Sequence, residues 1–365
     1  MKKIILLSYI LALSVLLSCS DSNEPDLTVS APVDLQQPWQ FSSAAEENTE
    51  DLTSVLVNAN QLKRLTSALV FRNGKLIAES YYKGFKKDSL HDVRSVTKGV
   101  MALLIGIALE KGFLKSVDDP IGDYLPLTEF ALTEQQKNIT VLHLLTMSGG
   151  FQWDETNGNS YNEWILSGKP VDFLLEKPLT HSPGSAFNYN SAAVHLLGIV
   201  LDKATGTNVP AFADQYLFSK IGIAKVQWEQ FEESYINGGS GIQLRPEDMA
   251  RIGQLMLQKG KSGIEVIVSE EWIKSMTDPS YTWRNNYEAL RNYTYGKLWW
   301  VQDATLNKAY FAWGFGGQII YVVPEKNLVI ITTTNWIKSS EAGGVEVIEQ
   351  EAFDLIINKI VPKVK

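Results

Sequence analysis

Cysteine is almost absent from this chain of 365 residues, since Cys19 is the only one. A single cysteine cannot form a disulfide within the chain, so the fold must be held together by its hydrophobic core. Histidine is also scarce, and no two histidines form the i, i+4 pair of a zinc protease motif; the four are His91, His143, His181 and His195. We therefore expect no metal site and no cofactor.

Basic runs are missing too. The formal net charge is −8, and no segment interleaves lysine or arginine with aromatic residues. A nucleic-acid groove needs such a basic surface, so nucleic acid is excluded as a partner. A P-loop glycine pattern and a Gly-x-Ser-x-Gly elbow are also lacking, because the stretch GGSGI from Gly238 has no final glycine. These absences argue against nucleotide hydrolysis and an α/β-hydrolase triad.

The chain starts with two lysines followed by an apolar run, Ile4 to Leu17. This run is too short to span a bilayer comfortably and is typical of an export signal. The stretch LLSC that ends at Cys19 resembles the bacterial lipobox. We predict a signal peptide over 1–18, lipid attachment to Cys19 and a location outside the cytoplasm, anchored to a bacterial membrane on the periplasmic side or at the cell surface. A plain cleaved secretion signal is the alternative.

The composition of 19–47, rich in Ser, Asp, Glu, Pro and Gln, predicts a flexible tether, and a single folded domain is expected over 48–362. A helix is predicted near Leu52 to Arg64. Two β-rich runs around Asn73-Gly74, from Ala68 to Gly84, predict a hairpin.

Helical patterns dominate about 117–235, after a helix expected over roughly Val96 to Lys111. The texture returns to strands from about Tyr295, and a final helix is expected from about Val345 to Lys359. Strands at both ends of the chain predict an α/β (α+β) fold, in which one antiparallel sheet is built from both chain ends, flanked by helices, with an inserted all-helical region.

A Ser-x-x-Lys pair, Ser95 and Lys98, stands at the start of the long apolar helix. Three residues along a helix place both side chains on one face, and the helix start favours developing negative charge. A lysine can take the proton of a serine hydroxyl only where its surroundings disfavour the ammonium, and the apolar run behind Lys98 can provide them. The plain alternative is that Ser95 or Thr97 caps the helix and Lys98 is solvated.

The spacing alone is weak evidence, because Ser80 and Lys83 share it. That second pair falls in a predicted strand, where residues three apart point to opposite faces. We therefore expect the side chains of Ser95 and Lys98 to meet and those of Ser80 and Lys83 to stay apart.

Several blocks in a fixed order resemble the serine hydrolases related to class C β-lactamases and penicillin-binding proteins. The resemblance covers about Leu69 to Asn335 and rests on RSVTKGVMALLIGIALEKGFL, VDDPIGDYLP, ITVLHLLTMSGG, PGSAFNYNSAAVHLLG, GGSGIQLRPEDMARIGQLML and WGFGGQIIYVVP. It implies a β-lactamase/transpeptidase-like fold, in agreement with the layout above.

The resemblance implies that Ser95 is the nucleophile of an acyl-enzyme and that Lys98 is its base. The second family motif, Tyr-x-Asn, matches Tyr189-Asn190-Ser191 with serine in the last position. We expect neighbouring ammonium groups to lower the pKa of Tyr189, which would relay protons. Ser191 loses the simultaneous donor and acceptor of an amide, which puts its pairing with Lys98 in question.

The third family motif, Lys-Thr-Gly, corresponds to Ala312-Trp313-Gly314, so its cation and hydroxyl are missing. By resemblance, the backbone N–H groups of Ser95 and Phe315 would form the oxyanion hole, and Ser191, Trp313 and Gly314 would contact substrate. Without the lysine, β-lactams and carboxylate-ended peptides are disfavoured unless Arg245 or Arg291 supplies the charge. An aromatic set is expected either to line an acyl or aryl pocket or to pack in the core: Trp153, Trp299, Trp300, Trp313 and Phe315.

These observations predict a serine hydrolase that cleaves a small ester or amide through an acyl-enzyme. A β-lactamase or cell-wall D-peptidase is the close alternative. A catalytically silent module that binds peptidoglycan or a peptide at the same cleft is the alternative of another class.

Overall fold

The computed structural model describes residues 31–232, 235–303 and 308–365. The predicted signal peptide over 1–18 and the predicted lipidation site, Cys19, lie outside these residues. Across these ranges, the structure contains no helix of sufficient length and apolarity to cross a membrane.

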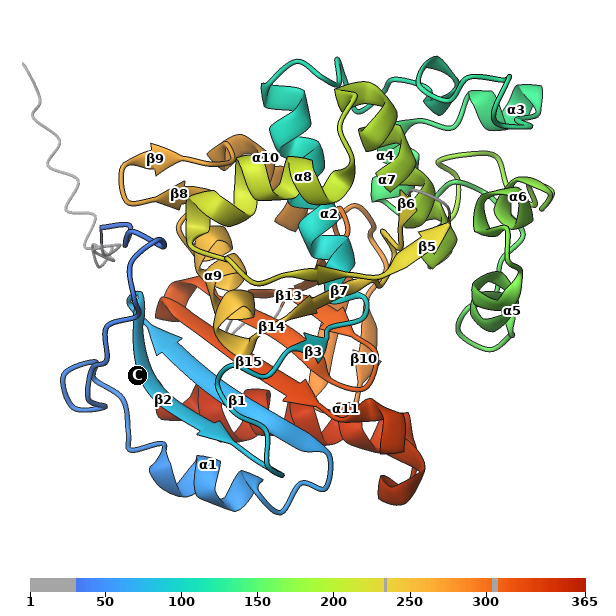
Figure 1. The fold of residues 1–365 in the computed structure, drawn as a ribbon. Coiled ribbons are helices and arrows are strands. Elements are labelled where there is room, and N and C mark those ends of the chain that lie inside the picture. Colours follow the sequence, from blue (N-terminus) through green and yellow to red (C-terminus); the bar gives the residue numbers. More distant parts are fainter. Residues whose placement is uncertain (1–30, 233–234, 304–307) are drawn as a thin grey trace, which may run out of the picture.

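An eight-stranded antiparallel sheet forms the centre of the molecule (Figure 1). Its strand order is β10-β11-β12-β13-β14-β15-β1-β2, so the amino-terminal hairpin continues a sheet made by the carboxy-terminal strands. The predicted fold class is thereby confirmed. The strands are β1 Leu65–Arg72, β2 Lys75–Tyr81, β10 Asn285–Tyr287, β11 Leu290–Tyr295, β12 Trp300–Gln302, β13 Ala309–Gly314, β14 Gln318–Val323 and β15 Leu328–Thr334.

Both faces of this sheet are buried under helices. Along β1, Leu69 and Phe71 point into one hydrophobic cluster, and Ala68 and Val70 into the other, as the period of two in a strand requires. The first face is covered by α2 (Val96–Glu110) and α9 (Pro246–Leu257), and the second by α1 (Thr53–Ala59) and α11 (Val345–Asp354) (Figure 1). The helix α2 also packs against α7 (Ser191–Thr205) and α10 (Glu270–Thr277), so it lies between the sheet and the helical region.

The helical region carries most of the remaining helices and lies beyond α2 (Figure 1). Its helices are α3 Glu134–Lys137, α4 Val141–Leu145, α5 Ser160–Leu166, α6 Pro170–Leu175, α7 Ser191–Thr205 and α8 Val209–Ala213. A small sheet β3-β7-β4 and two short hairpins complete the fold with α10. Their bounds are β3 His91–Asp92, β4 Gln227–Trp228, β5 Gln230–Glu232, β6 Tyr235–Ile236, β7 Ile242–Leu244, β8 Lys261–Ser262, β9 Glu265–Val266 and α10 Glu270–Thr277.

The described part of the predicted tether, 31–47, is packed against the domain rather than free. Leu35 is 1% exposed, and its carbonyl accepts a hydrogen bond from the Arg251 guanidinium. Phe41 bridges to Leu76 at the edge of the sheet. A polar composition concealed the buried Leu35, so the folded body begins earlier than residue 48.

Two predicted elements have different bounds in the structure. The helix expected near Leu52 to Arg64 ends at Ala59. The strand expected from Tyr295 is interrupted, because Leu298 has φ +57° and the chain reverses there between β11 and β12. The stretch YGKLWWV therefore contains a hairpin turn, at Gly296-Lys297-Leu298-Trp299, instead of forming one strand.

Candidate active site

Ser95 occupies the residue before the first turn of α2, and its side chain does not cap the helix. Its Oγ instead accepts a hydrogen bond of 2.8 Å from Lys98 Nζ. Thr97 also does not cap this end, because its hydroxyl donates to the Arg94 carbonyl and accepts from the Ile242 N–H. The alternative of a capped helix with a solvated lysine does not describe this structure.

Lys98 is the centre of a buried polar network. Lys98 is only 1% exposed. Its Nζ donates three hydrogen bonds: to Ser95 Oγ at 2.8 Å, to Ser191 Oγ at 2.8 Å and to the Gly239 carbonyl at 2.7 Å. These three acceptors match the three N–H donors of an ammonium group. The pairing of Ser191 with Lys98, which the serine substitution put in question, is therefore present.

Burial lowers the pKa of Lys98 to about 7, from an ordinary value of 10.5. The Glu155 carboxylate opposes this shift, and the Arg94 guanidinium adds to it. Removing a lysine from water disfavours its charged form, which is the condition for it to act as a base. A substantial fraction of Lys98 is consequently neutral near pH 7.

Tyr189 precedes α7 and places its ring beside the same amine, with Lys98 Nζ 4.9 Å from the ring centroid. Burial raises the pKa of the Tyr189 phenol above its ordinary value, and the Glu155 carboxylate raises it further, while a hydrogen bond with Ser95 lowers it. The expectation of a lowered pKa was wrong, because it counted the nearby cation and not the burial or the carboxylate. Tyr189 is a neutral phenol that can donate a proton.

A carboxylate that the sequence did not single out, Glu155, completes the network. Its Oε1 accepts from Ser191 Oγ at 2.6 Å, and its Oε2 accepts from the Ser191 N–H at 2.8 Å and from Trp153 Nε1 at 3.0 Å. Glu155 lies in an irregular loop, so no periodicity or motif spacing marks it. The sequence pointed to such a group only indirectly. Ser191 stands where the family motif has asparagine, so its hydroxyl needs a hydrogen-bond acceptor from elsewhere in the chain, and Glu155 provides it.

The predicted oxyanion segment touches the chain just before Ser95. A side chain at Gly314 would place its Cβ 2.2 Å from the Val93 carbonyl, so glycine is required there by close approach. The following turn is held by Glu349, whose Oε1 accepts the Gly316 N–H at 2.8 Å. Burial raises the pKa of this carboxyl to about 7. The sequence did not reveal Glu349, which lies far along the chain on α11.

The aromatic set divides into two groups. Trp299 is fully buried and Trp153 nearly so, and both belong to the core. Trp300 is half-buried and stacks on Tyr189, with ring centroids 5.9 Å apart and planes at 18°. Trp313 is also half-buried and lies 5.7 Å from Trp300, whereas Phe315 is 45% exposed. Of the set, Trp300 lies beside Tyr189, whereas Trp313 also packs against Phe353 in the cluster on the α11 face of the sheet.

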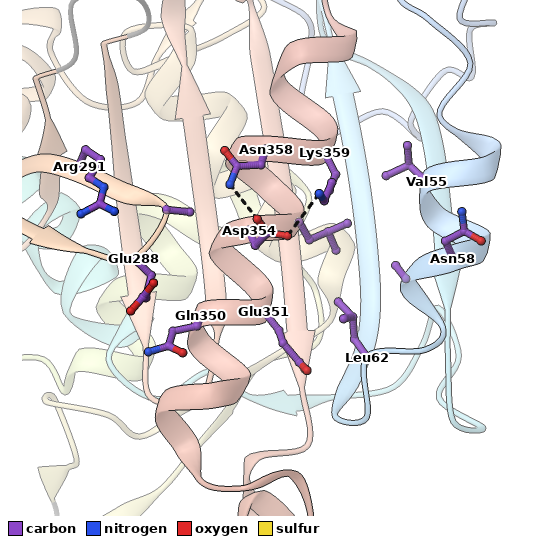
Figure 2. A pocket seen from close by; sticks show the side chains of 13 residues that line it. Val55, Asn58, Leu62, Glu288, Arg291, Gln350, Glu351, Asp354, Asn358 and Lys359 are labelled. Atoms are coloured by element: carbon purple, nitrogen blue, oxygen red, sulfur yellow. Dashed lines mark hydrogen bonds and ion pairs between the residues drawn. The ribbon is translucent and has the colours of Figure 1, made fainter.

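Neither arginine proposed to replace the missing lysine is near this network. Arg245 forms a two-pronged hydrogen bond with Asp248, with both distances 2.7 Å. Arg291 lines an open groove between α1, α11 and the β10–β11 hairpin, which Figure 2 shows on the α11 side of the sheet.

In the described ranges, no cluster of three or more His, Cys, Asp or Glu side chains is arranged to hold a metal ion.

The chain is similar to several known proteins. The family model described as Beta-lactamase matches residues 63–347. The 6-aminohexanoate-dimer hydrolase of Paenarthrobacter ureafaciens is 25% identical over 295 residues, which cover 73% of this chain and 72% of the relative. Esterase EstB of Burkholderia gladioli is 28% identical over 229 residues, or 55% of this chain and 58% of the relative.

A solved structure shows the same fold. The protein titled EstCE1, a hydrolase with promiscuous acyltransferase activity, superposes with a TM-score of 0.66 at 18% identity, covering 86% of this chain and 98% of that chain.

Proposed function

Because this chain belongs to the β-lactamase family of serine-type hydrolases, we propose that it hydrolyses a small ester or amide through an acyl-enzyme on Ser95. The observation that carries the proposal is the set of three hydrogen bonds around Lys98 Nζ. A polar network buried this deeply around a neutralisable lysine has a clear chemical use, which is to take the proton of the nucleophile.

The network selects Ser95 as the proton donor to Lys98. A neutral amine has two N–H donors and one lone pair, so one of its three partners must donate to it. The Gly239 carbonyl has no proton, and the Ser191 hydroxyl donates to Glu155 at 2.6 Å. Only the Ser95 hydroxyl remains free to donate. Neutral Lys98 is thus oriented as the general base for Ser95.

The later steps use the neighbouring groups. Attack of Ser95 Oγ on a carbonyl carbon would put negative charge on the carbonyl oxygen, which the backbone N–H groups of Ser95 and Phe315 are proposed to bind. The Tyr189 phenol would donate its proton to the leaving group and recover one through Lys98. Water would then attack the acyl-enzyme with Lys98 again as base, releasing the acid and free Ser95.

The proposal that the substrate is a small ester or amide is based on the residues missing from the third family motif. Ala312 and Trp313 stand where the family carries a cation and a hydroxyl, so the lysine that would bind the carboxylate of a β-lactam is missing. The names of an esterase and an aminohexanoate-dimer hydrolase among the relatives support ester and amide substrates. A D-peptidase or β-lactamase remains the alternative in the same fold, as the name of the matching family model supports.

Substrate comparison and product partitioning test this proposal together. We expect 4-nitrophenyl butyrate or the matching anilide to be hydrolysed faster than a chromogenic cephalosporin. With methanol added, 4-nitrophenyl butyrate and phenyl butyrate should give one ratio of methyl butyrate to butyrate, because both pass through the same acyl-enzyme. Different ratios would contradict the acyl-enzyme, rapid cephalosporin turnover would contradict the substrate, and no turnover of any of them would favour the silent binding module.

Replacing Glu155 by glutamine is expected to move the acidic limb of kcat/KM to lower pH. The wild type needs neutral Lys98, so its kcat/KM should rise with pH through a midpoint near 7. The carboxylate raises the Lys98 pKa, so removing its charge lowers the pH at which the amine becomes neutral. A pH profile measures this, with the exposed Glu163→Gln on α5 as control. An unchanged or raised midpoint would exclude the electrostatic role of Glu155.

A further inference from the structure

Arg94, the residue directly before Ser95, is held in an unusual backbone conformation. Its φ is +51°, in the left-handed region that non-glycine residues seldom adopt. The Asp92 carboxylate accepts the Arg94 N–H at 3.0 Å and stabilises this turn. Strained backbone of this kind is concentrated at functional sites.

The Arg94 guanidinium lies among aromatic rings from three separate segments. Its Cζ is 4.7 Å from the ring centroid of Trp336, 5.4 Å from that of Tyr161 and 6.0 Å from that of Phe315. Its Nη2 also donates to the Tyr161 hydroxyl at 2.8 Å. A guanidinium packed on ring faces and fixed by a hydrogen bond has little freedom to lose when it binds a ligand. It is therefore preorganised at the edge of the site.

The protein satisfies this cation only in part. Among the described residues its carboxylate partner is Asp92, whose Oδ2 lies 3.5 Å from Nη1. With the hydrogen bond to Tyr161, this contact uses two of the five N–H donors of a guanidinium. The Nε–H is buried without a partner among the described residues. The side chain is 17% exposed, so a small ligand can reach its outer edge.

Arg94 lies next to the proposed nucleophile, where its guanidinium could contact a bound substrate. Phe315, whose ring contacts the guanidinium, is the residue whose N–H is proposed for the oxyanion hole. We propose that Arg94 binds a carboxylate group of the substrate, on the Phe315 and Trp336 side of Ser95, and so selects anionic esters or amides over neutral ones. This inference rests on the proposed function and narrows its substrate class. Arg94, directly before Ser95, would then supply the positive charge that the family's lysine supplies from the position of Ala312 on β13.

Two matched ester pairs test this selectivity. In one pair the carboxylate is on the leaving group, as in 4-carboxyphenyl butyrate and its methyl ester. In the other it ends the acyl chain, as in the 4-nitrophenyl half-ester of adipic acid and 4-nitrophenyl hexanoate. The readout is the ratio of kcat/KM for the charged ester to that for the neutral ester. Arg94 also influences Lys98, so the ratio isolates the contact with the carboxylate from any change in the chemical step.

The wild type is expected to favour the charged ester in one of the two pairs. Arg94→Gln should lower that ratio by ~10-fold or more, mainly through KM, and Arg94→Lys should retain part of it, since a charged contact is lost in the first and weakened in the second. Arg291→Gln, on the other side of the sheet, should leave the ratio unchanged.

The failures of the two proposals are distinguishable. If Arg94→Gln and Arg94→Lys hydrolyse the neutral esters with unchanged ratios in both pairs, the carboxylate contact is wrong and the serine hydrolase remains. If the wild type prefers the neutral ester in both pairs, the contact is also wrong. If the wild type hydrolyses no ester, the proposed function fails, and the inference that rests on it fails too.

Discussion

Replacing Ser95 by alanine is expected to lower kcat/KM for 4-nitrophenyl butyrate by ~10⁴-fold or more, since removing the nucleophile of a coupled catalytic unit removes nearly all of the unit's effect. The fold should be retained, because the Ser95 side chain makes no cap hydrogen bond to α2 and Lys98 keeps its other two acceptors. Steady-state turnover and thermal unfolding measure the two effects separately.

Ser80→Ala is the matched control for this variant, because it removes the same atom from the other Ser-x-x-Lys pair. Ser80 lies on β2, and Lys83 binds the carbonyl and side chain of Asn60 rather than Ser80. We expect the Ser80 variant to keep wild-type turnover. Wild-type activity in Ser95→Ala, or equal losses in both variants, would show that Ser95 is not the nucleophile.

Replacing Lys98 by methionine is expected to lower kcat/KM by ~10³-fold or more, because the base that takes the Ser95 proton is removed. Methionine is unbranched and fits the apolar surroundings of the lysine stem. Burying an ammonium costs free energy, and this cost disappears in the variant. Against that gain, Ser191 Oγ and the Gly239 carbonyl lose their donor, at about 1–3 kcal/mol for each unsatisfied group.

The two stability effects of Lys98→Met oppose each other, so we expect a melting temperature close to that of the wild type. The fall in kcat/KM would then reflect loss of the base and not loss of folded protein. Lys83→Met is the control, since Lys83 is exposed and should be replaceable without loss of turnover. If Lys98→Met kept its activity at neutral pH while Ser95→Ala lost it, another group would have to be the base.

Local sequence features predicted the elements that local physics determines. The dipeptide Asn73-Gly74 predicted a tight turn, and both residues have positive φ between β1 and β2, at 50° and 74°. The apolar run after Ser95 predicted α2 within one residue at its end. The strands β10 and β11 were not predicted, because Arg291 and Asn292 are exposed near the sheet edge and give no apolar alternation.

The candidate site was predictable where spacing along one helix decides contact, and elsewhere only by resemblance. Ser95 and Lys98 meet because they are three residues apart on α2. Glu155 meets Ser191 across 36 residues of chain, through a loop whose path depends on the packing of the helical region. Arg94 was overlooked for a related reason, since its turn conformation and its aromatic neighbours belong to the tertiary structure.

Modification of the protein by a fluorophosphonate probe tests whether Lys98 activates Ser95. Its rate is measured against pH, and the modified residue is mapped by peptide mass spectrometry. We expect one adduct, on the peptide that contains Ser95, with a rate that rises with pH through a midpoint near 7, where Lys98 becomes neutral. The Glu155→Gln variant should show the same adduct with a lower midpoint. An adduct on another residue, or no adduct at any pH, would contradict the claim that Lys98 activates Ser95 as the nucleophile.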